Sequence, residues 1–441
     1  MTALSLYRDL EARGILKQVT DVKLETALAA APMTLYCGFD PTSDSLHVGS
    51  LLPLLTLRRF QLAGHRVIAV AGGATGSIGD PSGKTAERSL LTDEVLAFNL
   101  AGITRVISRF LELSGSNPAR VVNNGDWFRD MTFIGFLRDV GKHFTVNYMM
   151  AKESVRARLE DREHGISFTE FSYMLLQAYD YLVLNERENC RLQIGGSDQW
   201  GNITAGTELI RRIRASRGEI SAETGALPLE KECFGLTHPL VMKADGTKFG
   251  KSEKGTIWLD AKRTSPYQFY QYFLNTADAD VLTQLKLFTF RDHAELTALE
   301  KAVQTEPAKR AAQIALARDM TELVHGTDEL ARVESASRAL FGDSLRDLDE
   351  QTLLEVLGEA PSTKLGRDRL AAGLALVDLL VETGLCNGKG TARKDIQAGG
   401  IYVNNERVAD PAAMVGAAQL LAGSSVVLRK GKRNYHLVRF S

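Results

Sequence analysis

Two short segments, far apart in the sequence, carry side chains suited to phosphate chemistry. The first, His47-Val48-Gly49-Ser50, follows the turn Asp40-Pro41-Thr42 at the expected start of a helix. A helix N-terminus presents free N–H groups to phosphate, and an imidazole and a hydroxyl can donate hydrogen bonds to developing charge. The second, Lys248-Phe249-Gly250-Lys251-Ser252, carries ammonium groups that could close over a bound polyphosphate. Each has an ordinary explanation when taken alone, because short motifs recur by chance and most Gly/Lys segments are surface loops.

Three polar residues in FSYMLLQAYD predict a binding pocket. Tyr173, Gln177 and Asp180 are spaced by four and three residues, so they share one face of a helix. Three polar groups in a row are costly in a core unless they bind something. The alternative is a half-buried amphipathic face.

A third stretch, GATGSIGDPSGKT (73–85), resembles a P-loop only superficially. Three residues separate Gly79 from Gly83, and Ile78 stands where the first glycine of that motif is required. We therefore exclude a P-loop here.

The elements that position these residues alternate between strands and helices. Apolar runs ending in Gly, Asp or Asn predict parallel strands at 34–40, 65–73, 119–127 and 190–198, with helical apolar spacing between them. We expect an α/β fold, a Rossmann-like doubly wound parallel sheet, with ligands at the carboxyl ends of the strands. The pattern is helical from 265 to about 340. At the C-terminus, a short basic helix precedes runs that alternate like strands.

Composition indicates an ordinary globular chain of several domains. Its 441 residues are 44% hydrophobic and 24% charged. No apolar run is long enough for a membrane span, and the N-terminus does not look like a signal peptide, so we expect a cytoplasmic protein without a membrane partner. The four cysteines form no C-x-x-C, which argues against a disulfide framework or a zinc site. We expect no metal bound by the protein.

Charge is unevenly distributed along the chain. From Lys364 onward there are 12 Lys and Arg against 6 Asp and Glu, and the acidic stretch DSLRDLDEQTLLEVLGEAPS precedes them. An anionic partner for this basic tail is one interpretation, and a solvated surface is the other.

Taken together, the two phosphate segments resemble the HIGH and KMSKS signatures of class I aminoacyl-tRNA synthetases. The 173–180 face, with Tyr36, resembles the tyrosine pocket of bacterial-type tyrosyl-tRNA synthetases. This resemblance spans essentially the whole chain and implies five segments. They are a catalytic domain (1–240), a mobile loop and connection (241–264), a helical anticodon-binding domain (265–342), an acidic linker (343–362) and an S4-like α+β RNA-binding domain (363–441).

The resemblance also implies roles for individual residues. Tyrosine would be bound by Tyr36, Asp80, Tyr173, Gln177, Asp180, Gln193 and Gln199. ATP would be bound by Gly38, Asp40, Gly49, Ser50, Gly196 and Asp198, with Lys84 and Arg88 at its phosphates. Catalysis would rest on Thr42, His47, Lys248, Lys251 and Ser252. In the S4-like domain, RNA would meet Arg393, Lys394 and Asn404.

The implied reaction is two-step aminoacylation. L-Tyrosine and ATP, with substrate-bound Mg²⁺, give tyrosyl-adenylate and pyrophosphate, and tyrosine then passes to the 3′ end of tRNA(Tyr). Asn124 to Trp127 and the apolar stretch after them lie where relatives form a homodimer interface. Two positions depart from the family pattern, because Ser50 replaces the second signature histidine and Gly125 replaces a common aromatic.

Three other classes of protein are alternatives to this interpretation. A tryptophanyl-tRNA synthetase is disfavoured by Tyr36, Asp180 and the S4-like tail. A nucleotidyltransferase would need neither the helical domain nor the tail. A non-catalytic RNA-binding relative is disfavoured by Asp80, Asp198 and the two loop lysines.

Overall fold

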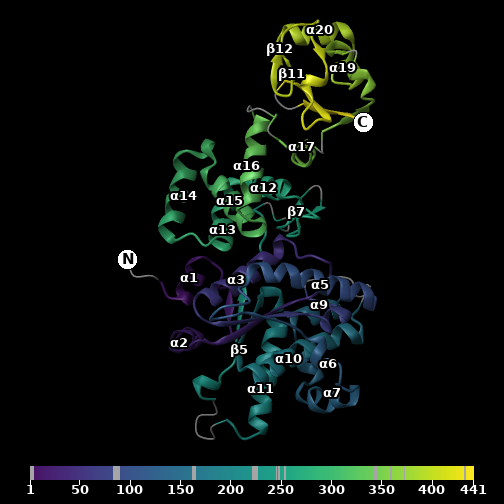
Figure 1. The fold of residues 1–441 in the computed structure, drawn as a ribbon. Coiled ribbons are helices and arrows are strands. Elements are labelled where there is room, and N and C mark those ends of the chain that lie inside the picture. The colour runs from purple at the N-terminus through teal and green to yellow at the C-terminus, as the bar shows by residue number, and fades with distance from the viewer. Residues whose placement is uncertain are drawn as a thin grey trace. The chain divides into compact units, whose positions relative to one another are not determined.

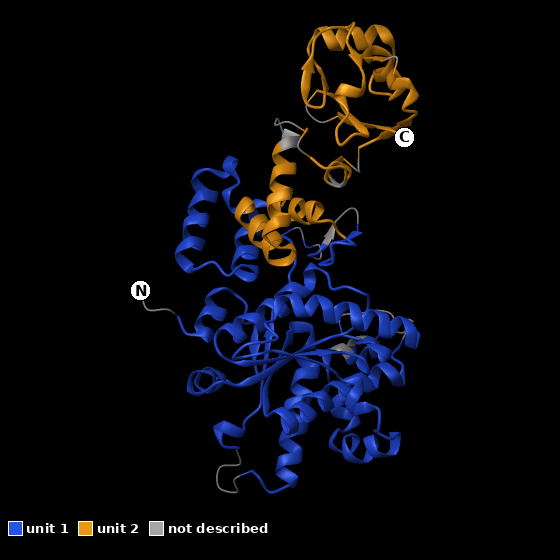
Figure 2. Ribbon diagram, viewed as in Figure 1, with its two compact units in different colours: residues 1–263, 276–312 blue, residues 264–275, 313–441 orange. Residues whose placement is uncertain are grey.

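The computed structural model describes residues 4–441 except 83–89, 161–164, 221–226, 245, 247–248, 253–254, 342–344, 347, 358–359, 372 and 432–433. The chain divides into two compact units, coloured separately in Figure 2. One comprises residues 1–263 and 276–312, and the other comprises residues 264–275 and 313–441. The expected helical segment 265–342 therefore contributes to both units, and the five-segment division stays a prediction.

A six-stranded sheet forms the centre of the first unit (Figure 1). Its order is β1 (Gln18–Val19), β6 (Phe234–His238), β5 (Cys190–Gly196), β2 (Thr34–Phe39), β3 (Arg66–Ala71) and β4 (Arg120–Asn123). All neighbours are parallel except β1, which is antiparallel to β6. The chain runs outward from β2 to β4 and returns at β5, so the strand order reverses between β2 and β5. The predicted doubly wound sheet and its four predicted strands are confirmed, and β1 and β6 are additional.

Helices cover both faces of this sheet. The helices α3 (Leu51–Leu62) and α5 (Asp93–Phe110) pack on one face, and α10 (Phe168–Glu188) and α11 (Trp200–Ser216) pack on the other (Figure 1). Ser167 caps the start of α10, and Asn189 ends it in the left-handed conformation at φ 49°. A Cβ on Gly206 would lie 2.9 Å from the ring of Tyr181, so glycine permits the close contact of α10 with α11.

Shorter elements complete the first unit. They are α1 (Leu6–Ala12), α2 (Leu24–Ala30), α4 (Thr75–Ile78), α6 (Gly125–Phe128), α7 (Phe133–Asp139), α8 (Val146–Met150), α9 (Glu153–Glu160), β7 (Lys251–Ser252), β8 (Gly255–Thr256), α13 (Asp278–Phe288) and α14 (His293–Thr305).

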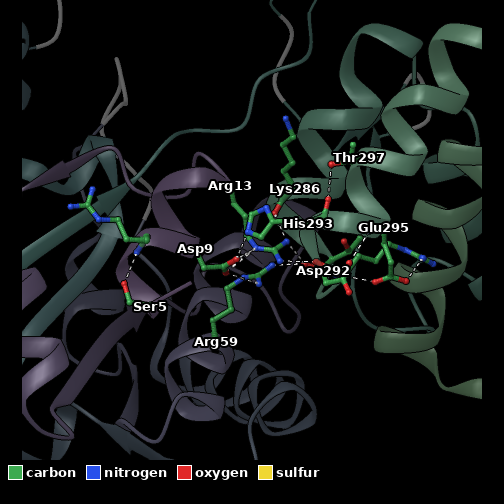
Figure 3. A network of polar contacts seen from close by, with 12 residues as sticks. Ser5, Asp9, Arg13, Arg59, Lys286, Asp292, His293, Glu295 and Thr297 are labelled. Carbon is green, nitrogen blue, oxygen red and sulfur yellow. Dashed lines mark hydrogen bonds and ion pairs between the residues drawn. The ribbon is translucent and has the colours of Figure 1, made fainter. Parts of the chain in front are cut away.

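Two arginines join α1 and α3 to the end of α13 (Figure 3). Arg13 donates to the carbonyls of Thr289 (3.4 Å) and Arg291 (2.6 Å), and Arg59 donates to the same Thr289 carbonyl. The last carbonyls of a helix lack intrahelical partners and carry negative partial charge. Guanidinium groups donate hydrogen bonds to these carbonyls and offset the charge. The Asp9 carboxylate accepts from Arg13 Nε at 2.9 Å and offsets the buried positive charge. The network fixes α3, and therefore the segment that precedes it, against α13.

The second unit begins with helices. It contains α12 (Pro266–Leu274), α15 (Ala311–His325), α16 (Thr327–Phe341) and α17 (Glu350–Leu357). The helix α17 lies inside the stretch expected to be an exposed acidic linker. That expectation is wrong for this part, because Leu353 and Leu357 are buried in the core of the unit.

The C-terminal part of the second unit is a five-stranded sheet with helices. The strands follow the order β12 (Glu406–Val408), β11 (Ile401–Val403), β14 (Ser425–Lys430), β15 (Asn434–Phe440) and β9 (Ser362–Leu365). The remaining elements are α18 (Asp368–Ala371), β10 (Leu374–Ala375), α19 (Leu376–Glu382), α20 (Lys389–Gln397) and β13 (Met414–Val415). Asn404 and Asn405 adopt φ 51° and 64°, as a two-residue turn between β11 and β12 requires. The expected α+β domain, with its basic helix before the strands, is confirmed.

Candidate active site

A cavity of about 330 Å³ opens at the carboxyl ends of the parallel strands of the first unit. Open α/β sheets bind ligands at this place, where the strand order reverses. The cavity gathers many of the residues singled out from the sequence, from segments far apart along the chain. Those lining it are Tyr36, Gly38, Asp40, Thr42, His47, Gly49, Ser50, Asp80, Tyr173, Gln177, Asp180, Gln193, Gly196, Asp198 and Gln199.

His47 caps the helical segment that begins at Val48. Its Nδ1 accepts a hydrogen bond from the backbone N–H of Gly49 at 3.0 Å, so the proton of the neutral imidazole is on Nε2. A Cβ on Gly49 would lie 2.6 Å from Cε1 of His47. Gly49 therefore makes room for the imidazole of His47, in addition to any close approach of a ligand.

The two signature segments meet through their backbones. The N–H of Val48 donates to the carbonyl of Ile257 (3.0 Å), and the N–H of Ile257 donates to the carbonyl of Gly250 (3.0 Å). Gly250 adopts φ +88°, and a Cβ there would lie 2.8 Å from Cγ2 of Val48. The short hairpin of β7 and β8 is thus held beside the His47 segment.

A buried carboxylate marks one end of the pocket. Asp180 accepts from Nδ2 of Asn124 (3.1 Å) and from Nε1 of Trp127 (2.8 Å). Burial raises the pKa of Asp180 to about 7, although these two donors act to lower it. Tyr36 lies on the same side of the sheet as α10, where its ring meets the edge of Tyr181. Its Oη has no hydrogen-bond partner among the described residues.

Asn124, the first residue of the stretch expected at a dimer interface, has a role in the pocket. It is fully buried (0% exposed) and binds Asp180, so it supports the pocket. Its Nδ2 also lies 3.0 Å from Oγ1 of Thr75, which donates to Asp40 at 2.8 Å. The hydroxyl of Tyr173 donates to the other oxygen of Asp40, also at 2.8 Å. One hydrogen-bond network therefore joins the carboxylates of Asp180 and Asp40.

A second polar group forms around Asp80. Its carboxylate accepts from Nε2 of Gln199 and from the backbone N–H of Ser82 (2.9 Å). Nδ2 of Asn202 holds the Oε1 of Gln199 at 3.2 Å. Asp80 and Gln199 were assigned to the same ligand from the resemblance, and they are in direct contact.

Several polar atoms of the lining have no protein partner. Tyr36 Oη, Gln177 Oε1, Gln193 Oε1 and His238 Nε2 are buried without a hydrogen bond among the described residues. A buried polar group without a hydrogen-bond partner lowers stability by about 1–3 kcal/mol, so such atoms normally bind water or a ligand. Their convergence on one cavity indicates a site for a polar organic ligand.

Sequence reasoning missed part of this lining. Thr75, Asn124 and His238 face the cavity, as does Cys37. The sequence offered little signal for the first three, because each is an isolated polar residue at the end of a strand or the start of a helix. The cysteines, Cys37 among them, were considered only for a disulfide framework or a zinc site.

Some predicted residues are only partly described or not described. Lys84, Arg88 and Lys248 lie outside the described residues, and Lys251 and Ser252 are described only as backbone of β7. In the part of the chain that the structure describes, no cluster of three or more His, Cys, Asp or Glu side chains is arranged to hold a metal ion. No helix there is long and apolar enough to cross a membrane.

The predicted RNA contacts differ in their surroundings. Arg393 and Lys394 are exposed on α20. Asn404 is buried, with its amide donating to the carbonyl of Gln419 (2.6 Å) and accepting from the N–H of Val427 (2.9 Å). Both polar atoms of the Asn404 side chain therefore hold the hairpin inside the domain, and contact of this turn with RNA stays a prediction.

Comparisons with known proteins identify the family of this chain. Residues 28–342 match the family model "tRNA synthetases class I (W and Y)", and residues 354–438 match "Tyrosine--tRNA ligase SYY-like C-terminal domain". The chain is 53% identical to the tyrosine–tRNA ligase of Opitutus terrae over 439 residues, which cover 99% of this chain and 100% of that protein. It is 52% identical to the enzyme of Geobacillus stearothermophilus over 441 residues, with coverage of 99% and 100%.

A solved structure gives the same result. The C-terminally truncated mitochondrial tyrosyl-tRNA synthetase of Aspergillus nidulans is similar at a TM-score of 0.68 and 31% identity, over 77% of this chain and 95% of that one. The C-terminal match and the relatives near 50% identity separate this chain from the tryptophan enzymes that share the first family model. The chain is an enzyme that belongs to the class I aminoacyl-tRNA synthetases and, among them, to the tyrosine–tRNA ligases.

Proposed function

We propose that this chain activates L-tyrosine with ATP and transfers it to tRNA(Tyr) through the pocket described above. The observation that carries the proposal is the phenol end of the pocket. There the buried Asp180 carboxylate is held by two donors, and Tyr36 Oη is buried without a partner. A substrate phenol supplies what both groups need, since it donates to the carboxylate and accepts from Tyr36.

The same groups select against phenylalanine. A substrate without the hydroxyl leaves the carboxylate of Asp180 and the hydroxyl of Tyr36 buried and unmatched, and tyrosyl-tRNA synthetases are a standard example of this kind of discrimination. The ammonium group of the substrate is bound by Asp80, Gln177 and Tyr173. Gln193 and Gln199 lie beside the amino acid.

Activation then proceeds by displacement at phosphorus. A carboxylate oxygen of tyrosine attacks the α-phosphorus of ATP, the bond from the α-phosphorus to the α,β-bridging oxygen breaks, and pyrophosphate leaves with the electron pair. The enzyme positions the reacting groups and stabilises the charge that develops on the phosphates. The Nε2–H of His47 and the hydroxyl of Thr42 donate to phosphate oxygens, and Lys248 and Lys251 offset the charge on the leaving pyrophosphate, with Ser252 beside them.

The nucleotide occupies the other half of the pocket. Gly38, Asp40, Gly49 and Ser50 line it from the His47 side, and Gly196 and Asp198 bind the ribose. Lys84 and Arg88 steady the phosphates. ATP enters as its Mg²⁺ complex, so the metal belongs to the substrate.

A pulse and chase tests the two steps. The chain is mixed with [14C]tyrosine and ATP, freed of small molecules by gel filtration, and then supplied with tRNA(Tyr). We expect retained label that transfers to tRNA without further ATP. Label retained without ATP, or label that never reaches tRNA, contradicts the proposal.

We further propose that the active form is a homodimer. On α7, Phe133 and Ile134 are 64% and 70% exposed, and Leu137 of the same helix is also exposed. Val146 and Met150 of α8 add further exposed apolar surface. Exposed apolar side chains of this kind are typical of a subunit interface. In a dimer with two-fold symmetry, the same surface of each subunit contacts the other.

A further inference from the structure

The pocket contains an imidazole that neither signature segment provides. His238 is the last residue of β6, is 5% exposed and lines the cavity. Its Nε2 is buried and has no hydrogen-bond partner among the described residues. The proposed mechanism gives this residue no task. Since a buried nitrogen without a hydrogen-bond partner is costly, it normally meets water or a ligand, and its place in the cavity favours a ligand group.

The protonation of His238 defines that ligand group. Its Nδ1 lies 3.3 Å from the carbonyl of Pro239, and a carbonyl only accepts, so Nδ1 carries the proton. Burial lowers the pKa of His238 to about 4, which keeps the ring neutral near pH 7. The Nε2 is therefore an acceptor, and its partner must be a hydrogen-bond donor.

Strand alternation places His238 on the nucleotide side of the sheet. A Cβ on Gly235 would lie 2.3 Å from Cγ2 of Ile203 in α11, so residue 235 faces α11. Successive residues of a strand face opposite ways, so His238, three positions on, faces away from α11. That is the side covered by α3, whose start follows His47. Tyr36 instead contacts Tyr181 of α10, on the α10 and α11 side.

A neighbouring carboxylate further defines the surroundings of His238 in the pocket. His238 is in register with Gly196 of β5. A Cβ on Gly196 would lie 2.4 Å from Oδ1 of Asp198, so this carboxylate lies directly beside Gly196. Two acceptors, His238 Nε2 and the Asp198 carboxylate, therefore stand next to the same backbone position.

We propose that His238 binds the nucleoside of ATP, with its Nε2 accepting a hydrogen bond from a nucleoside donor. The phosphates carry no such donor when ionised, and the donors of tyrosine are matched by Asp180 and Asp80. The donors left are the ribose hydroxyls and the 6-amino group of adenine, and the nearby Asp198 favours a hydroxyl. The inference rests on the proposed use of ATP.

Two substitutions distinguish the effect of the His238 hydrogen bond on ATP binding from the effect of the volume of its ring. His238→Leu removes the acceptor and keeps an apolar side chain, whereas His238→Gln places a carbonyl oxygen near the position of Nε2. Equilibrium binding of ATP to the full chain is measured for both. We expect His238→Leu to weaken ATP about three- to tenfold, as one neutral hydrogen bond predicts, and His238→Gln to recover most of the loss. The KM for tyrosine in pyrophosphate exchange should stay within twofold.

Three ATP analogues identify the donor. Wild-type binding of 2′-deoxy-ATP, 3′-deoxy-ATP and 6-deamino-ATP (purine riboside triphosphate) is compared with binding by His238→Leu. The analogue that lacks the contacted group should bind the two proteins equally, while ATP and the other analogues favour the wild type. Equal loss for ATP and all three analogues, or no loss of ATP affinity in His238→Leu, would overturn the inference.

A neighbouring substitution serves as the control for β6. Thr237→Val changes the adjacent residue on the opposite face, where Thr237 contacts Gln18. It should lower thermal stability and leave ATP affinity unchanged, and a loss equal to that of His238→Leu would refute a specific contact. The binding assay also separates this inference from the proposed function. If the wild type binds ATP but shows no tyrosine-dependent exchange, the proposed function is refuted and the inference about His238 is not.

Discussion

Replacing Trp127 by phenylalanine removes one hydrogen bond to Asp180 and leaves an aromatic ring. The indole Nε1 donates to Asp180 Oδ1 at 2.8 Å. A hydrogen bond to a charged group contributes about 1.5–3 kcal/mol, which corresponds to about 1–2 pKa units for the carboxylate that it stabilises. The pKa of Asp180 should therefore rise from about 7 to about 8–9.

The rise has a direct consequence for tyrosine activation. If the ionised carboxylate accepts the phenol hydrogen, kcat/KM for tyrosine falls as pH drops through the pKa of Asp180. In the wild type the fall should centre near pH 7, and in Trp127→Phe it should move up by about 1–2 pH units. Pyrophosphate exchange between pH 6 and 9 measures both profiles.

A control separates this effect from general damage to the helix. Phe128→Leu changes the next residue of α6, which packs in the same core without bonding Asp180. It should lower kcat/KM, if at all, by a similar factor at every pH. Superimposable pH profiles for the wild type and Trp127→Phe would refute the assigned role of Trp127.

Three further predictions follow from other parts of the chain. Gly49→Ala should lower kcat about tenfold or more with little change in the KM for tyrosine, because the new methyl group displaces the His47 imidazole, and equal kcat in pyrophosphate exchange would contradict this. Substituting Arg393 and Lys394 together by alanine should raise the KM for tRNA and flatten its salt dependence while exchange is unchanged, whereas equal loss in both assays would refute an RNA contact on α20. Ile134→Asp should give monomers in sedimentation equilibrium, while the same change at Leu113, exposed outside α7 and α8, should not, and an unchanged dimer in Ile134→Asp would exclude the α7 surface.

The sheet could be predicted where strands were long and ended in turn residues. The stretches that became β2, β3, β4 and β5 are apolar runs closed by Gly, Asp or Asn. The two-residue strand β1 is too short for any periodicity, and β6 is a five-residue run between irregular segments. Both depend on pairing with residues distant in the sequence, which periodicity does not report.

The site could be predicted where spacing along one helix grouped the side chains. Tyr173, Gln177 and Asp180 share a face of α10, so their spacing already indicated a pocket. Asn124 and His238 reach the same cavity from different strand ends, and only the strand order brings them together.

The acidic stretch before the basic tail shows the limit of charge as a signal. Charged residues surround Leu353 and Leu357, but these two leucines recur at a four-residue step and bury one face of α17. The net charge of the stretch reflects the exposed side of the helix. It gives no indication of the leucines that pack on the other side.

The central claim is that Asp180 and Tyr36 select tyrosine for activation at this site. Amino-acid-dependent exchange of pyrophosphate into ATP, measured side by side with tyrosine, tryptophan and phenylalanine, tests it most directly. We predict rapid exchange with tyrosine and a kcat/KM for phenylalanine and tryptophan lower by several orders of magnitude. Exchange with tryptophan or phenylalanine at a comparable kcat/KM, or none with tyrosine, would contradict it.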